Sequence, residues 1–381
     1  MSTPDDLSPL KTKPFKDAID KLEELMTQTG RAFLLGAGCS KCAGLPLTAQ
    51  LTSDALASAV LDATSKEILT SIQSNFVGAS FPNIEDYLSE LVDLLAIADR
   101  RTERGATKQE IELGGKPYSA KALLDATEQI KRAIAEVIEK PVSIETHWKF
   151  VRAVHRPVRP GTSTGNQRVD YLVLNYDTLI EDALALERIC FADGLDGGVT
   201  GWWNSATFSD EKLSARVLKL HGSINWCQFP DETLPRRVPK NINGTAVSDQ
   251  RIVIWPASTK YRETQLDPYA QLAMLARDVL RPKGGSQRVL AICGYKFGDS
   301  HINLELDRAL RESRDLTLVV FWSDESLEAT LKQWHEDSSV REQVLIYGKN
   351  GFWHGDTINP SATDLPWWKF ENITRLLGGE R

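Results

Sequence analysis

The stretch "RAFLLGAGCSKCAGLP", from Arg31 to Pro46, changes character within a few residues. Its apolar run "AFLLGAG" predicts a short buried strand that ends in glycines. From Leu45 onward the pattern predicts a helix with a proline in its first turn, where a missing N–H costs nothing. Because a strand, a glycine turn and a helix in this order open nucleotide-binding α/β domains, this stretch predicts the fold class.

The glycine turn has the composition of a phosphate site. Backbone N–H groups and the positive dipole end at the start of a helix attract a phosphate. Gly36 and Gly38 allow the backbone to bend and approach closely, and Ser40 adds a hydroxyl donor. The spacing G-A-G-x5-G is neither the G-x-G-x-x-G of dehydrogenases nor a P-loop. From these residues alone, phosphate binding and a plain tight turn both remain open.

Two cysteines in the turn, Cys39 and Cys42, have the spacing of a metal or redox pair. A structural zinc site usually needs a second pair, and the other three cysteines are isolated in the sequence. A redox pair before a helix fits the position but leaves the glycines unexplained. We interpret both cysteines as small apolar fillers and expect no metal.

Composition narrows the class of protein. The 381 residues carry a net charge of −7 and a pI near 5.6, which disfavours nucleic-acid binding through a basic face. No apolar run approaches the ~18 residues of a membrane span, and the N-terminus lacks an apolar signal core. An odd number of cysteines, not arranged as a disulfide framework, favours the reducing cytoplasm.

Apolar β-branched runs alternate with helical patterns in the second half of the chain, which predicts a mostly parallel sheet covered on both faces. Strands are expected in "DYLVLNYD", "RVLKLHG", "RIVIWP" (251–256), "RVLAICGY", "LTLVVFW" and "QVLIYG". Residues 65–155 read as helical, with a polar connection near 102–118. The expected fold is Rossmann-like α/β with a helical insertion after the first βα unit and no zinc module. Its expected parts are an N-terminal helix (1–30), the Rossmann-like domain (31–64 and 168–350), the insertion (65–167, ending in a turn-rich linker) and a C-terminal extension (351–381).

Three further segments place polar or glycine residues where strands are expected to end. Asn175 and Asp177 follow one strand, His221 follows the next, and Gly294 follows a third. Ligands of open α/β sheets bind beyond the carboxyl ends of the strands. We therefore expect these loops and the glycine turn to meet at one crevice.

This set, in this order, resembles the sirtuin (silent information regulator) family of NAD-consuming enzymes over roughly residues 30–350. The family's G-A-G-x-S-x-x-x-G-[IL]-P is matched by Gly36, Ala37, Gly38, Ser40, Gly44, Leu45 and Pro46. Its asparagine-x-aspartate is matched by Asn175 and Asp177, and its L-H-G by Leu220, His221 and Gly222. The forms "NYDTLIE" and "GYKFGDSHIN" are most similar to the divergent bacterial branch found in anti-phage defence, in particular to its stand-alone subunit that pairs with a HerA-type ATPase.

Two departures from the deacetylases of the family agree with that branch. Those enzymes follow the proline with an acidic residue, an aromatic and an arginine, and this chain has Leu47, Thr48 and Ala49. They also carry a zinc module with two cysteine pairs after the histidine, which this sequence lacks. Both departures count against transfer of ADP-ribose or acyl groups to or from a protein.

The resemblance implies cleavage of the nicotinamide–ribose bond of NAD, through an oxocarbenium-like sugar. It assigns His221 as base and Asn175 as the residue that orients a ribose hydroxyl or water. The residues implied in binding NAD, which is substrate rather than resident cofactor, are Gly36, Ala37, Gly38, Cys39, Ser40, Gly44, Pro46, Asp177, Gly294 and Tyr295.

Structural interpretations stand beside these. "NYD" can be an Asx-turn, and a lone histidine before glycine is more often structural. Glu85 and Asp86 are first-turn helix acids that can also face the pocket, and His301 has no partner at a metal-ligand spacing. Ten tryptophans suggest core packing first, and next an oligomer or partner surface, above all at the C-terminal "DLPWWKF".

The leading functional hypothesis is an NAD glycohydrolase that depletes NAD as a defence effector. The expected partners are NAD, further copies of the chain and a HerA-type DNA-translocating ATPase, with no direct nucleic-acid or membrane contact. Alternatives are a protein deacylase or ADP-ribosyltransferase, and a scaffold that senses NAD or ADP-ribose without turnover.

Overall fold

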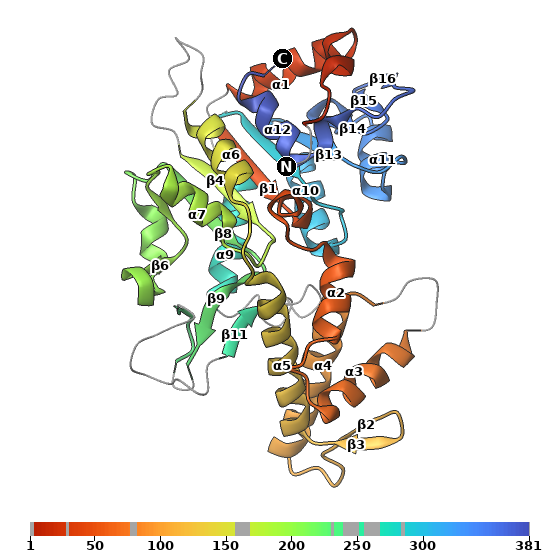
Figure 1. Cartoon of the computed structure of the whole chain (residues 1–381), viewed down its shortest axis with the longest axis vertical. Helices are drawn as coiled ribbons and strands as arrows, with labels where there is room; N and C mark the ends of the chain where they lie inside the picture. Colours follow the sequence, from red (N-terminus) through yellow and green to blue (C-terminus); the bar gives the residue numbers. More distant parts are fainter. Residues whose placement is uncertain are drawn as a thin grey trace.

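The computed structural model describes residues 4–27, 30–76, 82–156, 168–229, 232–238, 251–254, 267–282 and 286–380, and of 251–253 only the backbone. These residues form a large sheet with helices on both faces, a helical lobe at one end and a smaller second sheet (Figure 1). The expected linker therefore lies, from residue 157 to 167, outside the described residues.

The large sheet has the strand order β16-β15-β14-β13-β12-β1-β4-β8-β5. Neighbouring strands from β14 to β5 are parallel, and β15 and β16 pair antiparallel at the β14 edge. The predicted α/β fold with a mostly parallel sheet is thus confirmed. The strands are β1 (Gly30–Leu35), β4 (Val169–Val173), β5 (Phe191–Ala192), β8 (Ala215–Lys219), β12 (Arg288–Cys293), β13 (Leu316–Trp322), β14 (Val344–Gly348), β15 (Gly351–His354) and β16 (Thr357–Pro360).

Helices cover both faces because successive residues of each strand point to opposite sides. In β1, Phe33 and Leu35 pack into one core and Ala32 and Leu34 into the other. The first face is covered by α1 (Phe15–Met26), α6 (Glu145–His155), α7 (Leu179–Leu186) and α12 (Phe370–Leu377). The second face is covered by α9 (Tyr269–Leu280), α10 (Ser300–Glu312) and α11 (Ala329–Glu336).

The order of the strands reverses at β1. The chain runs from β1 to its neighbour β4 and on to β8, whereas β12 pairs with the other side of β1. Loops that leave such a switch point diverge and open a crevice at the carboxyl edge of the sheet. The loops after β12, β1, β4 and β8 leave from four adjacent strands at this edge.

The helical lobe, residues 48–138, has its own core, in which Ile68, Leu88 and Ile130 are fully buried. The connection near 102–118, expected to be polar, contains a hairpin whose Ile111 and Tyr118 pack into this core. The final helix of the expected insertion, α6, packs on the sheet against α7 and α12. The elements of the lobe are α2 (Thr48–Leu56), α3 (Ala63–Asn75), α4 (Ile84–Glu103), β2 (Ile111–Leu113), β3 (Lys116–Tyr118) and α5 (Ala120–Ile138).

A second, antiparallel sheet has the order β11-β9-β10-β7-β6. It corrects the expectation that "RIVIWP" continues the parallel sheet, because β11 pairs antiparallel with β9; residues 255–256 lie outside the described part. The strands are β6 (Leu195–Asp196), β7 (Trp202–Trp203), β9 (Gly222–Gln228), β10 (Arg236–Arg237) and β11 (Arg251–Ile254).

At the C-terminus, Trp367 is a core residue and Trp368 packs half-buried against the same core. Trp367 is fully buried, packs edge-on against Phe15 and Tyr347, and donates its indole N–H to the carbonyl of Gly348 at 2.8 Å. Core packing, the first interpretation of the tryptophans, is therefore confirmed for Trp367, and the alternative of a partner surface at "DLPWWKF" is wrong for this residue. By contrast, Trp202 and Val199 are exposed by 48% and 69%.

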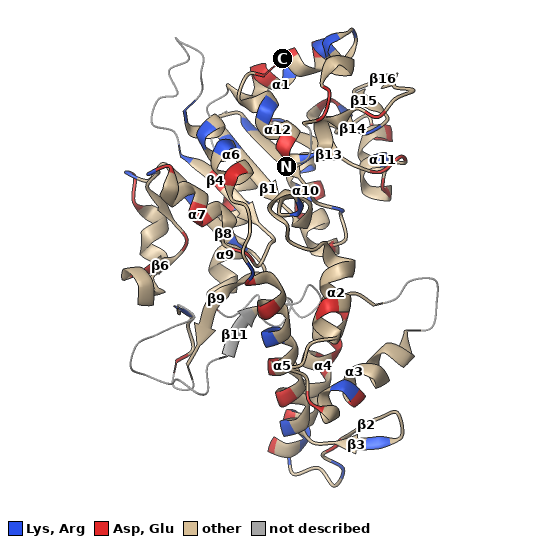
Figure 2. Ribbon diagram, in the orientation of Figure 1, with Lys and Arg blue, Asp and Glu red and all other residues tan. Residues whose placement is uncertain are grey.

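Charges of both signs are interspersed along the helices of the lobe and around the sheet (Figure 2). Exposed pairs such as Lys121–Asp125 on α5 lie one helical turn apart. Among the helices of the described residues, none combines the length and the apolar character that crossing a bilayer requires.

Candidate functional site

The glycine turn after β1 packs directly against the loop after β12. The N–H groups of Gly36 and Gly38 donate to the carbonyls of Cys293 and Gly294, each at 2.9 Å. A Cβ on Gly36 would come within 2.6 Å of the Gly294 carbonyl oxygen, and one on Gly38 within 2.7 Å of the Gly294 Cα. Gly294 has φ +63 and space for no Cβ, because Cys39 N would lie 2.4 Å away. These glycines are needed because two backbones meet at the switch point.

The turn itself differs from the predicted strand–turn–helix. It folds as two 3-10 turns, Ala37–Cys39 and Lys41–Ala43, and α2 begins only at Thr48. Pro46 precedes the N-cap residue Leu47 and so lies outside the first turn of the helix. The N–H groups of Cys39 and Ser40 donate to carbonyls within the turn, at 3.0 and 3.2 Å. The expectation of open N–H groups at a helix start is wrong for these residues and for Gly38.

The two cysteines of the turn are neutral thiols in a packed environment. The Cys39 thiol donates to the carbonyl of Cys293 and the Cys42 thiol to that of Cys39, both at 3.2 Å. Burial raises the pKa of the Cys39 thiol well above its usual value and that of Cys42 to about 11. Since the thiolate is the metal ligand and the nucleophile, these groups are poorly suited to either task.

Three side chains from the loops after β1 and β4 form the Ser40 cluster: Ser40, Asn175 and Asp177. The Ser40 hydroxyl donates to Asp177 Oδ2 at 2.6 Å and accepts from Asn175 Nδ2 at 2.7 Å. Asp177 Oδ1 accepts the backbone N–H of Leu179 at 3.1 Å, so the Asx-turn is present as well. One aspartate thus shapes its own loop and orients a hydroxyl that in turn orients an amide.

Lys219, which was not among the predicted site residues, holds the backbone of this cluster at Asp177. Its side chain is fully buried at the end of β8 and donates to the backbone carbonyl of Asp177. Its ammonium lies 3.5 Å from Glu181 Oε1. Burial raises the pKa of the Glu181 carboxyl to about 7, and the positive charge of Lys219 opposes that rise. A lysine within the otherwise apolar end of the predicted strand "RVLKLHG" was the sequence signal that could have identified this residue.

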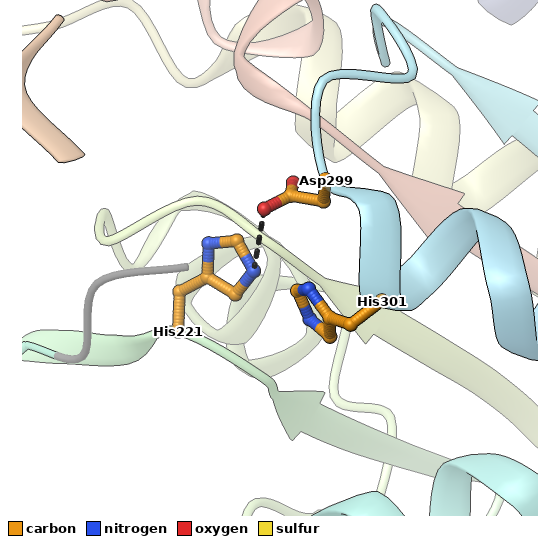
Figure 3. A group of neighbouring side chains, drawn as sticks. All are labelled: His221, Asp299 and His301. Carbon is orange, nitrogen blue, oxygen red and sulfur yellow. Dashed lines mark ion pairs between the residues drawn. The ribbon is translucent and has the colours of Figure 1, made fainter. Parts of the chain in front are cut away.

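His221 lies two residues after Lys219, just beyond the end of β8, and is buried between two carboxylates. Its Nδ1 is 3.6 Å from Glu85 Oε1, and its Nε2 is 3.9 Å from Asp299 Oδ1 (Figure 3). The ring of Tyr176, the residue after Asn175, lies with its centroid 6.5 Å from that of His221. The loops after β4 and β8 are therefore in contact.

The two first-turn acids of α4 have different positions. Asp86 forms a capping box with Asn83, which fixes the start of the helix. Glu85 extends toward His221 and also accepts the Tyr176 hydroxyl at 3.5 Å. Of the two roles considered for these acids, Asp86 takes the structural one and Glu85 faces the histidine.

Asp299 and His301 come from the start of α10, within the quoted "GDSHIN". Asp299 is the N-cap residue but makes no capping hydrogen bond, and its carboxylate is directed at His221. The ring of His301 lies 6.2 Å from that of His221. One ligand atom from each of His221, Asp299 and His301 lies within 4.8 Å of the others. His301 thus has partners that its sequence spacing did not indicate. Together with Glu85 these residues form the His221 cluster.

Tyr295 fixes the loop that carries Asp299. Its hydroxyl lies 2.9 Å from Asn303 Oδ1 and accepts the backbone N–H of Asp299 at 3.2 Å. The side chain is buried and packs on Phe297. Its position favours a role in shaping the loop after β12.

The structure therefore brings together the four loops that the sequence analysis selected. Gly36 and Gly38 contact Gly294, Ser40 bonds Asn175 and Asp177, and Tyr176 links the Ser40 cluster to His221. Gly44, with φ +95, and Pro46 lie farther along, where the turn leads into the lobe. The arrangement offers a polarised amide, an imidazole and two carboxylates at one sheet edge.

Part of the chain matches a known protein family. Residues 170–341 match a family model described as a SIR2-like domain. The match begins on β4 and includes Asn175, His221 and Asp299, and it omits β1, the glycine turn and the lobe. No curated protein matches the chain in sequence. A SIR2-like domain is compatible with an NAD-utilising activity.

Proposed function

We propose that this protein is an NAD glycohydrolase. Water replaces nicotinamide at the anomeric carbon of the adjacent ribose, giving nicotinamide, ADP-ribose and a proton. One observation carries the proposal: Tyr176 brings the loops of Asn175 and His221 together at the switch point of an α/β sheet. Both residues lie within the segment that matches a SIR2-like domain.

Asn175 would position the reacting groups. Because its Nδ2 donates to Ser40, the rotation of the amide is fixed and Oδ1 is the acceptor for a ribose hydroxyl or the incoming water. Nicotinamide leaves as a neutral molecule, so orientation and stabilisation of the sugar cation matter more than a strong acid.

His221 would act as the base. A neutral imidazole can take the proton of a ribose hydroxyl or water, and Glu85 and Asp299 would stabilise the resulting positive charge. Burial of His221 in low-dielectric surroundings strengthens both interactions.

The glycine turn, with Gly294 and Tyr295, would form the wall beside the dinucleotide. The turn lacks side chains at Gly36 and Gly38 and packs against Gly294, which lets two backbones line the site. Since the N–H groups of Gly38, Cys39 and Ser40 already have acceptors, we propose that close approach of the backbone, rather than a ring of open amides, admits the pyrophosphate.

The test is direct measurement of nicotinamide and ADP-ribose after incubation with NAD, for the protein alone and with a partner ATPase. His221→Ala should lower turnover by about 10²–10⁴-fold, the usual contribution of a general base. His354→Ala, on β15 near the other end of the sheet, serves as the matched control and should retain wild-type turnover. Absence of products in every assembly, or full turnover in His221→Ala, would contradict the proposal. An NAD-dependent acyl-peptide assay separates hydrolysis from deacylation.

We further propose that hydrolysis depletes cellular NAD as an anti-phage defence in the cytoplasm, by a homo-oligomer assembled with a HerA-type ATPase. The resemblance of "NYDTLIE" and "GYKFGDSHIN" to the defence branch supports this setting. The exposed Val199 and Trp202 provide an apolar surface for assembly. Interspersed charges of both signs agree with no direct contact to nucleic acid (Figure 2). Co-purification with the ATPase, and loss of NAD in infected cells only when both are present, would test it.

A further inference from the structure

We propose that His221, Asp299 and His301 form a binding site for a divalent transition-metal ion, best matched by Zn²⁺, and that the ion inhibits the enzyme by occupying its base. The inhibitory part rests on the proposed function, whereas the site itself does not. Two imidazoles and one carboxylate are a ligand set that Zn²⁺ accepts, with a further position open to water.

The three groups already surround one point. Their ligand atoms lie within 4.8 Å of one another, and Figure 3 shows a nitrogen of each ring and a carboxylate oxygen turned toward the space between them. Zinc–ligand bonds of about 2.0–2.2 Å in a tetrahedron separate the ligand atoms by roughly 3.4 Å. His221 Nε2 and Asp299 Oδ1 are 3.9 Å apart, so a shift of about half an ångström brings this pair to bonding geometry.

Two of the ligands stand on a rigid element. Asp299 and His301 belong to the N-cap and first turn of α10, and the Tyr295 hydroxyl holds the backbone N–H of Asp299. An aspartate at an N-cap normally accepts a hydrogen bond from the second or third helical N–H. The Asp299 side chain makes no such bond and is aimed at His221. A capping role therefore does not account for its orientation.

Glu85 lies on the side of His221 away from the proposed metal ion, where it contacts the ligand and not the metal. With His221 Nε2 on the metal, Nδ1 carries the proton and faces Glu85 Oε1 at 3.6 Å. A carboxylate behind a metal-bound histidine fixes the ring and raises its basicity. Glu85 and Asp299 also place two carboxylates beside the proposed site, which favours a dication there.

Occupancy would remove the proposed base. Nε2 cannot bind both a metal ion and a proton, because each uses the same lone pair. Zn²⁺ would therefore compete with the proton transfer on which NAD cleavage depends, and removal of the ion by a chelator would restore it.

Competition between the metal-stripped full-length protein and a chromogenic zinc chelator at pH 7.5 measures the site without using activity. We expect one equivalent of bound Zn²⁺. Asp299→Asn and His301→Ala should each weaken binding by about 100-fold or more, since even loss of an outer-shell group costs roughly 10–100-fold. Asparagine remains a good N-cap, so Asp299→Asn preserves α10. His335→Ala on α11, outside the cluster, is the matched control.

Nicotinamide release at increasing Zn²⁺ then tests inhibition, each variant being compared with its own metal-free rate. The inhibitory concentration should rise in the same order as the dissociation constant, and EDTA should reverse the effect. Binding that all variants retain, or no stoichiometric binding, would overturn the site even if NAD is hydrolysed. Stoichiometric binding that depends on Asp299 and His301 would support the site even if NAD is not hydrolysed. Turnover that is unchanged or raised with Zn²⁺ bound would overturn inhibition.

Discussion

The Ser40 cluster and the His221 cluster lie at the same sheet edge but are held differently. In the first, Ser40 makes hydrogen bonds of 2.6 and 2.7 Å, and buried Lys219 anchors the backbone of Asp177. In the second, the carboxylates of Glu85 and Asp299 lie 3.6 and 3.9 Å from the nitrogens of His221. These are ion-pair distances, longer than hydrogen bonds.

The difference suits the two proposed roles, in which the Ser40 cluster positions Asn175 and the His221 cluster takes part in the reaction. A direct hydrogen bond to the buried Ser40 hydroxyl, itself bonded to the buried Asp177, holds Asn175 in one orientation. The looser spacing between the His221 imidazole and the two carboxylates suits stabilisation of a proton or a metal ion on that ring. Variants that act on one cluster and spare the other therefore test whether the two clusters differ in this way.

The largest loss of stability is expected at the contact between the glycine turn and the loop after β12, because these two loops carry residues of both clusters. Gly294→Ala places a Cβ 2.4 Å from Cys39 N at φ +63, so steric overlap adds to backbone strain. We expect a loss of about 3–5 kcal/mol in the free energy of unfolding, measured by urea denaturation. Gly298→Ala, whose Cβ meets nothing within 4 Å, is the matched control and should change stability by under about 1 kcal/mol. Equal effects of the two would show that the loops do not meet as described.

The next effect tests the contrast itself. Ser40→Ala removes a donor from Asp177 and an acceptor from Asn175, and we expect it to cost about 2–3 kcal/mol of unfolding free energy. Asp299→Asn should cost under about 1 kcal/mol, because its carboxylate makes no capping bond and asparagine caps equally well. Both are measured by denaturation at pH 7.5. A loss from Asp299→Asn as large as that from Ser40→Ala would contradict the looser character of the His221 cluster.

The smallest effect is a pH dependence on the side of the Ser40 cluster. The pKa of Glu181 is about 7 in the folded protein and near 4.5 ordinarily, so the folded state binds this proton more tightly. Its contribution to stability is therefore present below pH 4.5 and is lost as the pH rises through 7.

Glu181→Gln removes this titration. Between pH 5 and pH 8 the unfolding free energy of the variant should fall by about 2 kcal/mol less than that of the wild type. Denaturation curves at the two pH values measure the difference, and a pH-independent offset from the loss of the Lys219 partner cancels. Parallel pH profiles would show that Glu181 stays ionised in the folded protein.

Local patterns predicted what depends on near neighbours in the chain. The apolar runs of β1, β4, β8, β12, β13 and β14 predicted strands, because strands buried on both faces of a parallel sheet are mostly apolar. The loops that carry Asn175, His221 and Gly294 could be placed at one edge, because each follows a strand and the carboxyl ends of parallel strands share an edge. The hairpin at Ile111 and Tyr118 was missed, since short strands carry little periodic signal. β11 was predicted as a strand, but its antiparallel pairing with β9 was not.

The sequence by itself determined a parallel α/β sheet and the set of loops at its carboxyl edge, because both follow from local hydrophobic periodicity. Only the tertiary structure decided which side chains meet there. Glu85 reaches His221 from a helix 136 positions earlier, and Asp299 and His301 reach it from the start of α10. Contacts between distant segments depend on how helices pack over the sheet, and spacing along the chain carries no record of that packing.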